Sequence, residues 1–401
     1  MHQQLVTFNA GSSSVKIGTF ASDGQQIRKL ARGEIDLNAS PVTFRLRGEN
    51  VKLDIALTSA GTANIVSILE ELFARLSDHV SPENILAIGH RVVFGGDEFA
   101  GPILLDDEHI EAIESLSIYA PLHQPKSTAL IRAVRKLLPH LPQAASFDTA
   151  FHQTIADKVR RFAVPGALHE RGIKRYGFHG LSYQSIIENF SRQEPELARG
   201  KIVAAHLGSG ASLCAMDGGK SVDTSMSFST LDGIPMATRC GTLDPGVLLH
   251  LLQQENMKAD ALSDLLYHRS GLLGLSGISG DTRDLLASDD ACAREALDIL
   301  TARIAGETCR LAATLGGLDA LIFTAGIGEH QPAIRKAVCE RLSWLGLDVD
   351  ASANQNDAFR ITKPSCKVAA FVLATDEEQI IASQTLDALR NTAAAVPVAS
   401  A

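Results

Sequence analysis

Two short turns containing glycine and serine, half a chain apart, constrain the fold more than any other feature of the sequence. The first follows an apolar strand at residues 5–8 and reads Asn9-Ala10-Gly11-Ser12, and the second follows a strand at 202–206 and reads His206-Leu207-Gly208-Ser209. Gly11 and Gly208 are 197 residues apart (208 − 11) in a chain of 401. The spacing fits an internally duplicated α/β fold whose halves grip one polyphosphate, and it also fits a coincidence of two hairpins.

The length and composition indicate a soluble globular protein of two domains. A chain of 401 residues exceeds the ~250–300 residues at which single cores stop growing. Hydrophobic residues make up 45% and charged residues 21%, as in ordinary globular domains. The net charge of −9 argues against a nucleic-acid groove or an anionic membrane as partner. Phosphate binding would therefore depend on local cations, metal ions or backbone N–H groups.

The cysteines and the N-terminus indicate a cytosolic location. The six cysteines include no CxxC pair, so neither a zinc ribbon nor a disulfide framework is expected. Residues 1–4 lack the basic and apolar regions of a signal peptide. The apolar run at 368–374 is too short to span a bilayer.

Hydrophobic periodicity predicts alternating strands and helices along the whole chain. Strands are expected at 5–8, 86–94, 144–147, 202–206, 213–216, 320–324 and from about 368. Helices are expected at 62–77, 127–138, 291–314, from Pro332, and through Leu386 at the end, with a glycine turn at 325–329.

The first turn contains what a phosphate-binding loop needs. Gly11 lets the backbone approach a ligand, Ser12 to Ser14 supply hydroxyl and N–H donors, and Lys16 adds a positive charge. Asn9 could hold a metal-bound water. An ordinary serine-rich hairpin is the alternative. The complete Walker, dinucleotide-binding, protein-kinase and GxSxG motifs are all absent from the sequence.

Two arginines, Arg91 and Arg239, occur in weakly charged segments and each would need an anion. A guanidinium matches carboxylate or phosphate with a bidentate fork. The alternative for each is a structural Arg–Asp pair. Two such arginines from distant segments favour an anion site.

Three further residues are candidates for chemistry, each with a structural alternative. Asp148 follows a strand and could act on a carboxyl substrate or a metal, or could cap a helix. His179 lies between glycines and could equally be a structural histidine. Glu377 could bind Mg²⁺ or could be a solvated residue at a helix N-terminus. The glycine-rich segment 323–329 would suit a purine, with 279–283 closing the other side, although each could be a capped turn.

In these blocks the chain resembles the acetate and propionate kinases of the actin/hexokinase/Hsp70-type ATPase superfamily. The blocks, in family order and at family spacing, are Asn9–Ser14, Gly89–Val93, Pro121–Pro125, Phe147–His152, Tyr176–Gly180, His206–Gly210, Thr238–Gly241, Gly326–Glu329 and Thr375–Glu378. The resemblance implies a duplicated ribonuclease-H-like (actin-like ATPase) α/β fold with a central interdomain cleft. The expected domains are 1–149 with about 379–401, and 150–378 carrying the nucleotide site.

The resemblance also implies roles for individual residues in a reversible transfer of the ATP γ-phosphoryl group to acetate. Asn9 and Glu377 would hold Mg²⁺ or Mn²⁺, and Ser12, Ser14 and Lys16 would face the phosphates. Arg91 and Arg239 would bind the carboxylate and the transferred phosphoryl group, His179 would stabilise its charge, and Asp148 would be the catalytic acid. Val93, Leu122 and Phe178 would form a methyl pocket. The expected nucleotide-contacting residues are His206, Leu207, Gly208, Ser209, Gly210, Asp281, Thr282, Arg283, Ala325, Gly326, Ile327, Gly328 and Glu329.

The chain departs from the family pattern at the second turn, where Ser209 replaces a common Asn. The shorter side chain bears on nucleotide affinity and on the choice of phosphoryl donor. A propionate kinase is the alternative enzyme, and a non-catalytic actin-like nucleotide switch is the alternative from another class. The resemblance further implies a homodimer, with a small carboxylate substrate and a nucleotide as partners.

Overall fold

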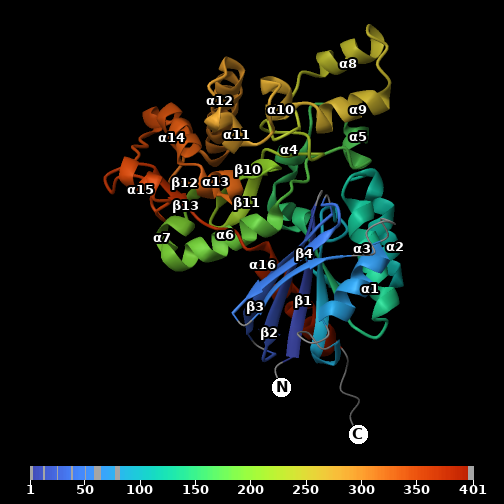
Figure 1. The fold of residues 1–401 in the computed structure, drawn as a ribbon. Helices are drawn as coiled ribbons and strands as arrows, with labels where there is room; N and C mark the ends of the chain where they lie inside the picture. Colours follow the sequence, from blue (N-terminus) through green and yellow to red (C-terminus); the bar gives the residue numbers. More distant parts are fainter. Residues whose placement is uncertain are drawn as a thin grey trace. The chain divides into compact units, whose positions relative to one another are not determined.

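The chain forms two compact units. The computed structural model describes residues 3–11, 14–24, 26–37, 39–49, 51–57, 65–76 and 82–395. The first unit consists of Met1–Phe151 and Asp376–Ala401, and the second of His152–Thr375. Figure 1 labels the helices and strands of both units along the chain.

The first unit is built on an eight-stranded mixed sheet of order β5-β4-β3-β2-β1-β6-β8-β7. β1 pairs antiparallel with β2 and parallel with β6, and β6 pairs parallel with β8. The strands are β1 (Gln3–Ala10), β2 (Ser14–Ser22), β3 (Ile27–Asp36), β4 (Thr43–Gly48), β5 (Val51–Ala56), β6 (Ile85–Val92), β7 (Ile103–Leu104) and β8 (Gln143–Phe147).

The second unit repeats the central part of this arrangement in a five-stranded sheet of order β11-β10-β9-β12-β13. β9 pairs antiparallel with β10 and parallel with β12, and β12 pairs parallel with β13. The strands are β9 (Lys201–Leu207), β10 (Ala211–Asp217), β11 (Lys220–Thr224), β12 (Ala320–Thr324) and β13 (Ala369–Val372). The order β3-β2-β1-β6-β8 thus matches β11-β10-β9-β12-β13 in sequence and direction. The expected duplicated α/β fold is confirmed, and the two glycine-serine turns occupy equivalent positions in it.

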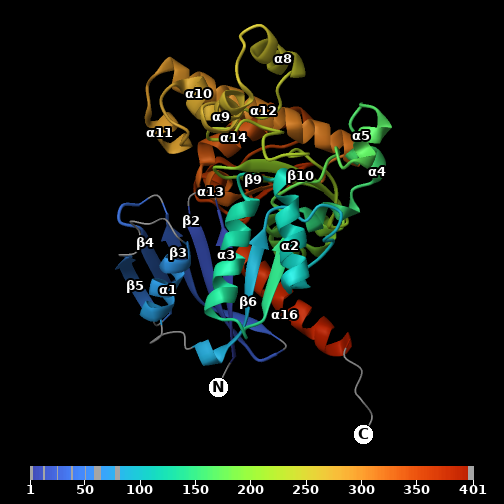
Figure 2. The same cartoon turned by 90° about the vertical axis from the view of Figure 1, so that its right-hand side faces the viewer.

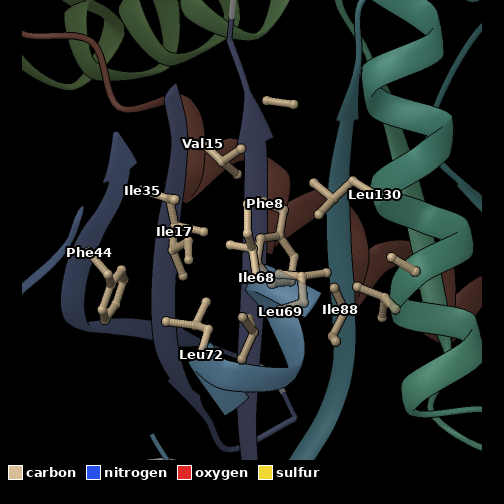
Figure 3. Close-up of a cluster of buried hydrophobic side chains, with 14 of the residues drawn as sticks. Phe8, Val15, Ile17, Ile35, Phe44, Ile68, Leu69, Leu72, Ile88 and Leu130 are labelled. Carbon is tan, nitrogen blue, oxygen red and sulfur yellow. The ribbon is translucent and has the colours of Figure 1, made fainter. Parts of the chain in front are cut away.

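Helices cover both faces of the first sheet, which explains why its central strands are mostly apolar and largely buried. Figure 2 shows α3 (Gln124–Leu137) and α16 (Glu377–Ala395) on opposite sides of the strands. Alternate residues of β1 serve the two faces: Phe8 packs in the cluster under α1 (Ile65–Leu76), and Leu5 packs against Ala382 and Leu386 of α16. Figure 3 shows the α1 side, where the labelled residues are Phe8, Val15, Ile17, Ile35, Phe44, Ile68, Leu69, Leu72, Ile88 and Leu130.

The remaining helices lie mostly in the second unit. They are α2 (Asp107–Ser115), α4 (Asp157–Arg160), α5 (Gly166–Glu170), α6 (Gly180–Gln193), α7 (Pro195–Ala198), α8 (Pro245–Gln253), α9 (Ala259–His268), α10 (Gly271–Ser276), α11 (Thr282–Ala287), α12 (Ala291–Leu315), α13 (Ala325–His330), α14 (Pro332–Arg341) and α15 (Ala351–Gln355). Within the residues that the structure describes, no helix combines the length and apolar character needed to cross a membrane.

One predicted element is wrong: the glycine turn expected at 325–329 is the helix α13. Ala325 takes a left-handed φ of 65° directly after β12, which turns the chain sharply into the helix. The Glu329 carboxylate then accepts a hydrogen bond of 2.8 Å from the Ala325 backbone N–H. This hydrogen bond caps the first turn and stabilises a helix that its two glycines and the left-handed alanine disfavour.

We predict that Gly89→Ala lowers the free energy of unfolding by about 1–3 kcal/mol, the usual cost of overpacking a core. A β-carbon at Gly89 would lie 2.2 Å from Thr385 Oγ1 and 2.7 Å from Ile381 Cγ2, both on α16. Urea unfolding measures the change. Gly101→Ala is the matched control, because its β-carbon would meet nothing within 4 Å. An equal loss of stability in both variants would contradict the packing argument.

Candidate active site

Asn9, the last residue but one of β1, connects the strand edge to the start of α16. Its side chain is 3% exposed. Its Nδ2 donates hydrogen bonds to Glu377 Oε2 (2.7 Å) and to Glu378 Oε1 (3.0 Å). Its Oδ1 accepts one from Arg91 Nη1 (3.0 Å). One amide therefore positions two carboxylates and a guanidinium.

Arg91 makes the internal ion pair with Asp148 that was the structural alternative in the sequence. Its Nη2 donates to Asp148 Oδ2 at 2.6 Å and its Nε to Oδ1 at 3.0 Å. The Asp148 side chain is 0% exposed and that of Arg91 is 13% exposed. Burial opposes the charged guanidinium, but Asp148, Glu377 and Glu378 outweigh it and raise the pKa of Arg91. The pair is thus a fixed, nearly buried charge system that still reaches solvent.

The other predicted residues of the first unit have different surroundings. Lys16 lies opposite Asn9 in the β1–β2 ladder, so their side chains share one face of the sheet. The turn between these strands is closed by a 2.8 Å hydrogen bond from Gly11 N–H to Ser14 O. Ser12 lies outside the described residues. Val93 is 2% exposed, whereas Leu122 is 37% exposed.

The oxygen donors around Asn9 suit a hard divalent cation. Glu377, Glu378 and Asp148 supply carboxylate oxygens to the same hydrogen-bonded cluster. Across the described part of the chain, no group of three or more His, Cys, Asp and Glu residues could hold a metal by itself. A small cation that keeps several waters and binds one or two carboxylates together with substrate phosphates fits such a partial set of ligands.

In the second unit, the side chains of two predicted site residues, Arg239 and His179, both lie close to Gly210. A β-carbon at Gly210 would lie 3.3 Å from Arg239 Nη2 and 3.5 Å from His179 Nε2. Arg239 Nη1 also donates a 2.9 Å hydrogen bond to Thr230 O. The β9–β10 turn therefore has donors from two other segments directly above its backbone. Glycine is needed here because a side chain would fill that space.

His179 and His206 form a parallel stack with their ring centroids 4.3 Å apart and an interplanar angle of 14°. Ser212 Oγ lies 2.8 Å from His179 Nδ1, and Ser182 Oγ lies 2.8 Å from His206 Nδ1. Two protonated rings at this separation would repel by about 4 kcal/mol at an effective dielectric constant of 20. The stack therefore favours at least one neutral imidazole. His179 itself has a left-handed φ of 58°, a strained conformation for a non-glycine residue.

A cavity of about 510 Å³ begins at the same turn. It is lined by Gly208, Ser209, Ala237, Gly280, Asp281, Thr282, Arg283, Gly326, Ile327, His330 and Gln331. Seven of the predicted nucleotide-contacting residues are in this lining. Gly326 has open space where its β-carbon would be. The volume is typical of a pocket for a small organic ligand.

Other predicted nucleotide-contacting residues have structural partners instead of lining this cavity. Glu329 caps α13 through Ala325, and a β-carbon at Gly328 would lie 3.2 Å from the Phe323 backbone. His206 and Leu207 are buried in β9, and His206 Nε2 would be 3.6 Å from a β-carbon at Gly208. Phe178 is 1% exposed.

Sequence reasoning missed four residues that hold the candidate site together: Ser182, Tyr183, Ser212 and Glu378. Ser182 and Tyr183 lie in the first turn of α6, immediately after His179, so their position in the sequence was an available signal. Ser212 lies on β10 and meets His179 only in the folded chain. Glu378 neighbours a predicted ligand, but its hydrogen bond to Asn9 spans 369 positions.

The comparisons with known proteins agree over almost the full length. A model of the acetokinase family matches residues 4–383. A protein named acetate kinase from Rhodopseudomonas palustris (strain ATCC BAA-98 / CGA009) is 44% identical over 389 residues, which cover 95% of this chain and 97% of the relative. One named acetate kinase from Methylocella silvestris is 40% identical over 404 residues, covering 98% and 100% of the two chains.

Solved structures also match almost the full length of this chain. A propionate kinase from Francisella tularensis superimposes with a TM-score of 0.88 at 33% identity, covering 95% of this chain and 98% of the other. An acetate kinase from Porphyromonas gingivalis gives a TM-score of 0.84 at 34% identity, with 96% and 100% covered. Since a family model, curated relatives and solved structures all align along the whole fold, this chain belongs to the acetokinase family.

Proposed function

We propose that the protein transfers the γ-phosphoryl group of ATP to acetate, giving acetyl phosphate and ADP, and that the reaction is reversible. The observation that carries the proposal is the meeting of Arg239 and His179 over Gly210, beside a cavity of about 510 Å³. Such a site offers fixed donors to the oxygens of a phosphoryl group. The full-length match to the acetokinase family supports the same reaction.

In phosphoryl transfer the protein mainly positions the reactants and stabilises charge, and it does little covalent catalysis. Acetate is ionised at neutral pH, so the nucleophile needs no deprotonation, and transfer is direct and in line. Arg239 and Arg91 offset the repulsion between two anions. Asp148 makes a bidentate pair with Arg91 and so orients that guanidinium. Its proposed role as catalytic acid would require it to carry a proton during turnover.

We assign Mg²⁺, with Mn²⁺ as a substitute, to Asn9 and Glu377. When bound, the metal would neutralise phosphate charge. Glu377 would supply the carboxylate, and Asn9 would orient it through the 2.7 Å hydrogen bond. Lys16, Ser12 and Ser14 would face the phosphates. The lining residues Asp281, Thr282, Arg283, Gly326 and Ile327 would contact the adenosine, with Ser209 at the phosphate end of the cavity.

A propionate kinase is the second candidate, because the propionate kinase from Francisella tularensis superimposes with a TM-score of 0.88. Val93, Leu122 and Phe178 would form the pocket that selects the acyl chain. One methylene group in an apolar pocket is worth about 1–3 kcal/mol, so the two substrates would differ by about 10- to 200-fold at most.

Trapping the acyl phosphate with hydroxylamine tests the reaction directly. We expect hydroxamate to form from ATP, Mg²⁺ and acetate, with a lower kcat/KM for propionate and a lower one still for butyrate. A higher kcat/KM for propionate would favour the second candidate. Slow ATP hydrolysis that no carboxylate stimulates would instead support an actin-like nucleotide switch and exclude both kinases.

We predict that Arg239→Ala lowers kcat by roughly 10²–10³, the usual loss when one donor to a developing charge is removed. Steady-state kinetics on the folded variant measures the change. Arg199→Ala is the matched control, since Arg199 is 75% exposed and pairs on the surface with Glu196, three residues earlier. Near-normal turnover of folded Arg239→Ala would overturn the assignment of this arginine.

We also propose a cytoplasmic homodimer, whose interface includes α8. All six cysteines are free, as expected in a reducing compartment. None of the nine residues of α8 is buried, although most of them are apolar, with Val247 40%, Leu249 53% and Leu252 38% exposed. An apolar helix without a buried face in its own chain fits burial by a second copy.

Leu249→Glu is therefore expected to shift the protein from dimer to monomer in analytical ultracentrifugation, because a buried unpaired carboxylate opposes association. Trp344→Glu, which changes another exposed apolar residue (72% exposed), is the control and should leave the dimer intact. A wild-type monomer, or a dimer in Leu249→Glu, would refute the assignment of α8.

A further inference from the structure

We propose that Ser212 and Tyr183 are positioning residues that place the ring proton of His179 on Nε2, the nitrogen that faces Gly210 and Arg239. The inference rests on the proposed function for its catalytic meaning, but its structural part stands on side-chain geometry alone. The chain of contacts runs from Tyr183 on α6, through Ser212 on β10, to Nδ1 of His179.

The three side chains form one short hydrogen-bonded path inside the second unit. Tyr183 Oη lies 2.5 Å from Ser212 Oγ, and Ser212 Oγ lies 2.8 Å from His179 Nδ1. Tyr183 and Ser212 are both 0% exposed. Buried hydroxyl groups need partners, so solvent cannot replace either contact at low cost.

The order of donors in this path follows from the chemistry of the groups. A phenol is a stronger acid than an alkyl hydroxyl, so the short contact is best made with Tyr183 as the donor and Ser212 as the acceptor. Ser212 then has its own proton to give to Nδ1 of His179. With Nδ1 accepting, a neutral His179 must carry its proton on Nε2.

Neighbouring groups restrain the plane of the ring. The parallel stack on His206 limits its tilt, and Ser182 holds His206 through Nδ1 in the same way. His152 Nε2 donates a 2.9 Å hydrogen bond to the carbonyl oxygen of Phe178, the residue before His179. Burial lowers the pKa of His152 to about 4, so this support is a neutral ring over the working range of pH.

The consequence is a donor that is ready before the substrate arrives. A β-carbon at Gly210 would lie 3.5 Å from His179 Nε2 and 3.3 Å from Arg239 Nη2, so both groups face the same space. An N–H at Nε2 donates to a phosphoryl oxygen whether the ring is neutral or charged. The opposite neutral tautomer would present a lone pair to an anion and would repel it.

The kinetic test uses Ser212→Ala, Tyr183→Phe and their double variant. We expect kcat to fall by about 10- to 100-fold in Ser212→Ala, the range seen when the outer partner of a functional histidine is removed, while KM for ATP stays within about twofold. We expect a smaller fall in kcat for Tyr183→Phe. The double variant should be no worse than Ser212→Ala, because both changes break one path. Tyr176→Phe is the matched control, since its hydroxyl donates a hydrogen bond to Gly172 O and is outside the path.

A second measurement separates this proposal from the proposed function. In protein labelled with ¹⁵N-histidine, the ring signals report which nitrogen of neutral His179 carries the proton, and His179→Gln identifies those signals. We expect Nε2–H in the wild type and in Tyr176→Phe, and a mixture of tautomers in Ser212→Ala or, should that variant not fold, in Tyr183→Phe. A proton on Nδ1 in the wild type, or unchanged tautomer and kcat in the folded variants, would overturn the inference. These signals do not depend on turnover. If the wild-type protein made no acyl phosphate, that result would refute the proposed function but not the assignment of the His179 tautomer.

Discussion

The carboxyl ends of parallel strands are the constraint on which each half of this molecule depends. In the first unit, β1 and β6 run parallel and so do β6 and β8, which brings Asn9, Arg91 and Asp148 to one edge from positions up to 139 residues apart (148 − 9). In the second unit, β9 and β12 place the Gly208–Gly210 turn beside the start of α13 in the same way. Candidate polar groups collect at these edges because the strands behind them are buried on both faces and consist mostly of apolar residues.

Sequence reasoning succeeded where the signal was local. The boundaries of β12 and the start of α14 at Pro332 follow from apolar runs and a proline, and these need no knowledge of the fold. His179 became a candidate because its flanking glycines mark close approach of the backbone to another group. The duplicated turns were visible, but whether they were equivalent depended on strand order, which only the folded sheets determine.

Sequence reasoning failed where one particular side-chain contact decides the outcome. Segment 325–329 contains two glycines and favours a turn, yet the local contact of Glu329 with the Ala325 amide caps it as a helix. The partner of Arg91 could not be chosen from sequence, because an external anion and an internal aspartate satisfy a guanidinium equally well. The contact of Ser212 with His179 could not be predicted either, because nothing near Ser212 in the sequence suggests a histidine as its neighbour.

The ion pair of Arg91 does not exclude its role as an anion ligand, and the geometry explains why. A guanidinium has five N–H groups in a fixed fork. Asp148 takes the Nε and one Nη2 donor, and Asn9 takes one from Nη1, so among the described residues these contacts occupy three of the five. The remaining two, one on each Nη nitrogen, belong to a side chain that is 13% exposed. Asp148 thus removes the rotational freedom of Arg91 without covering it, and an arginine that is already ordered loses less entropy when it binds an anion.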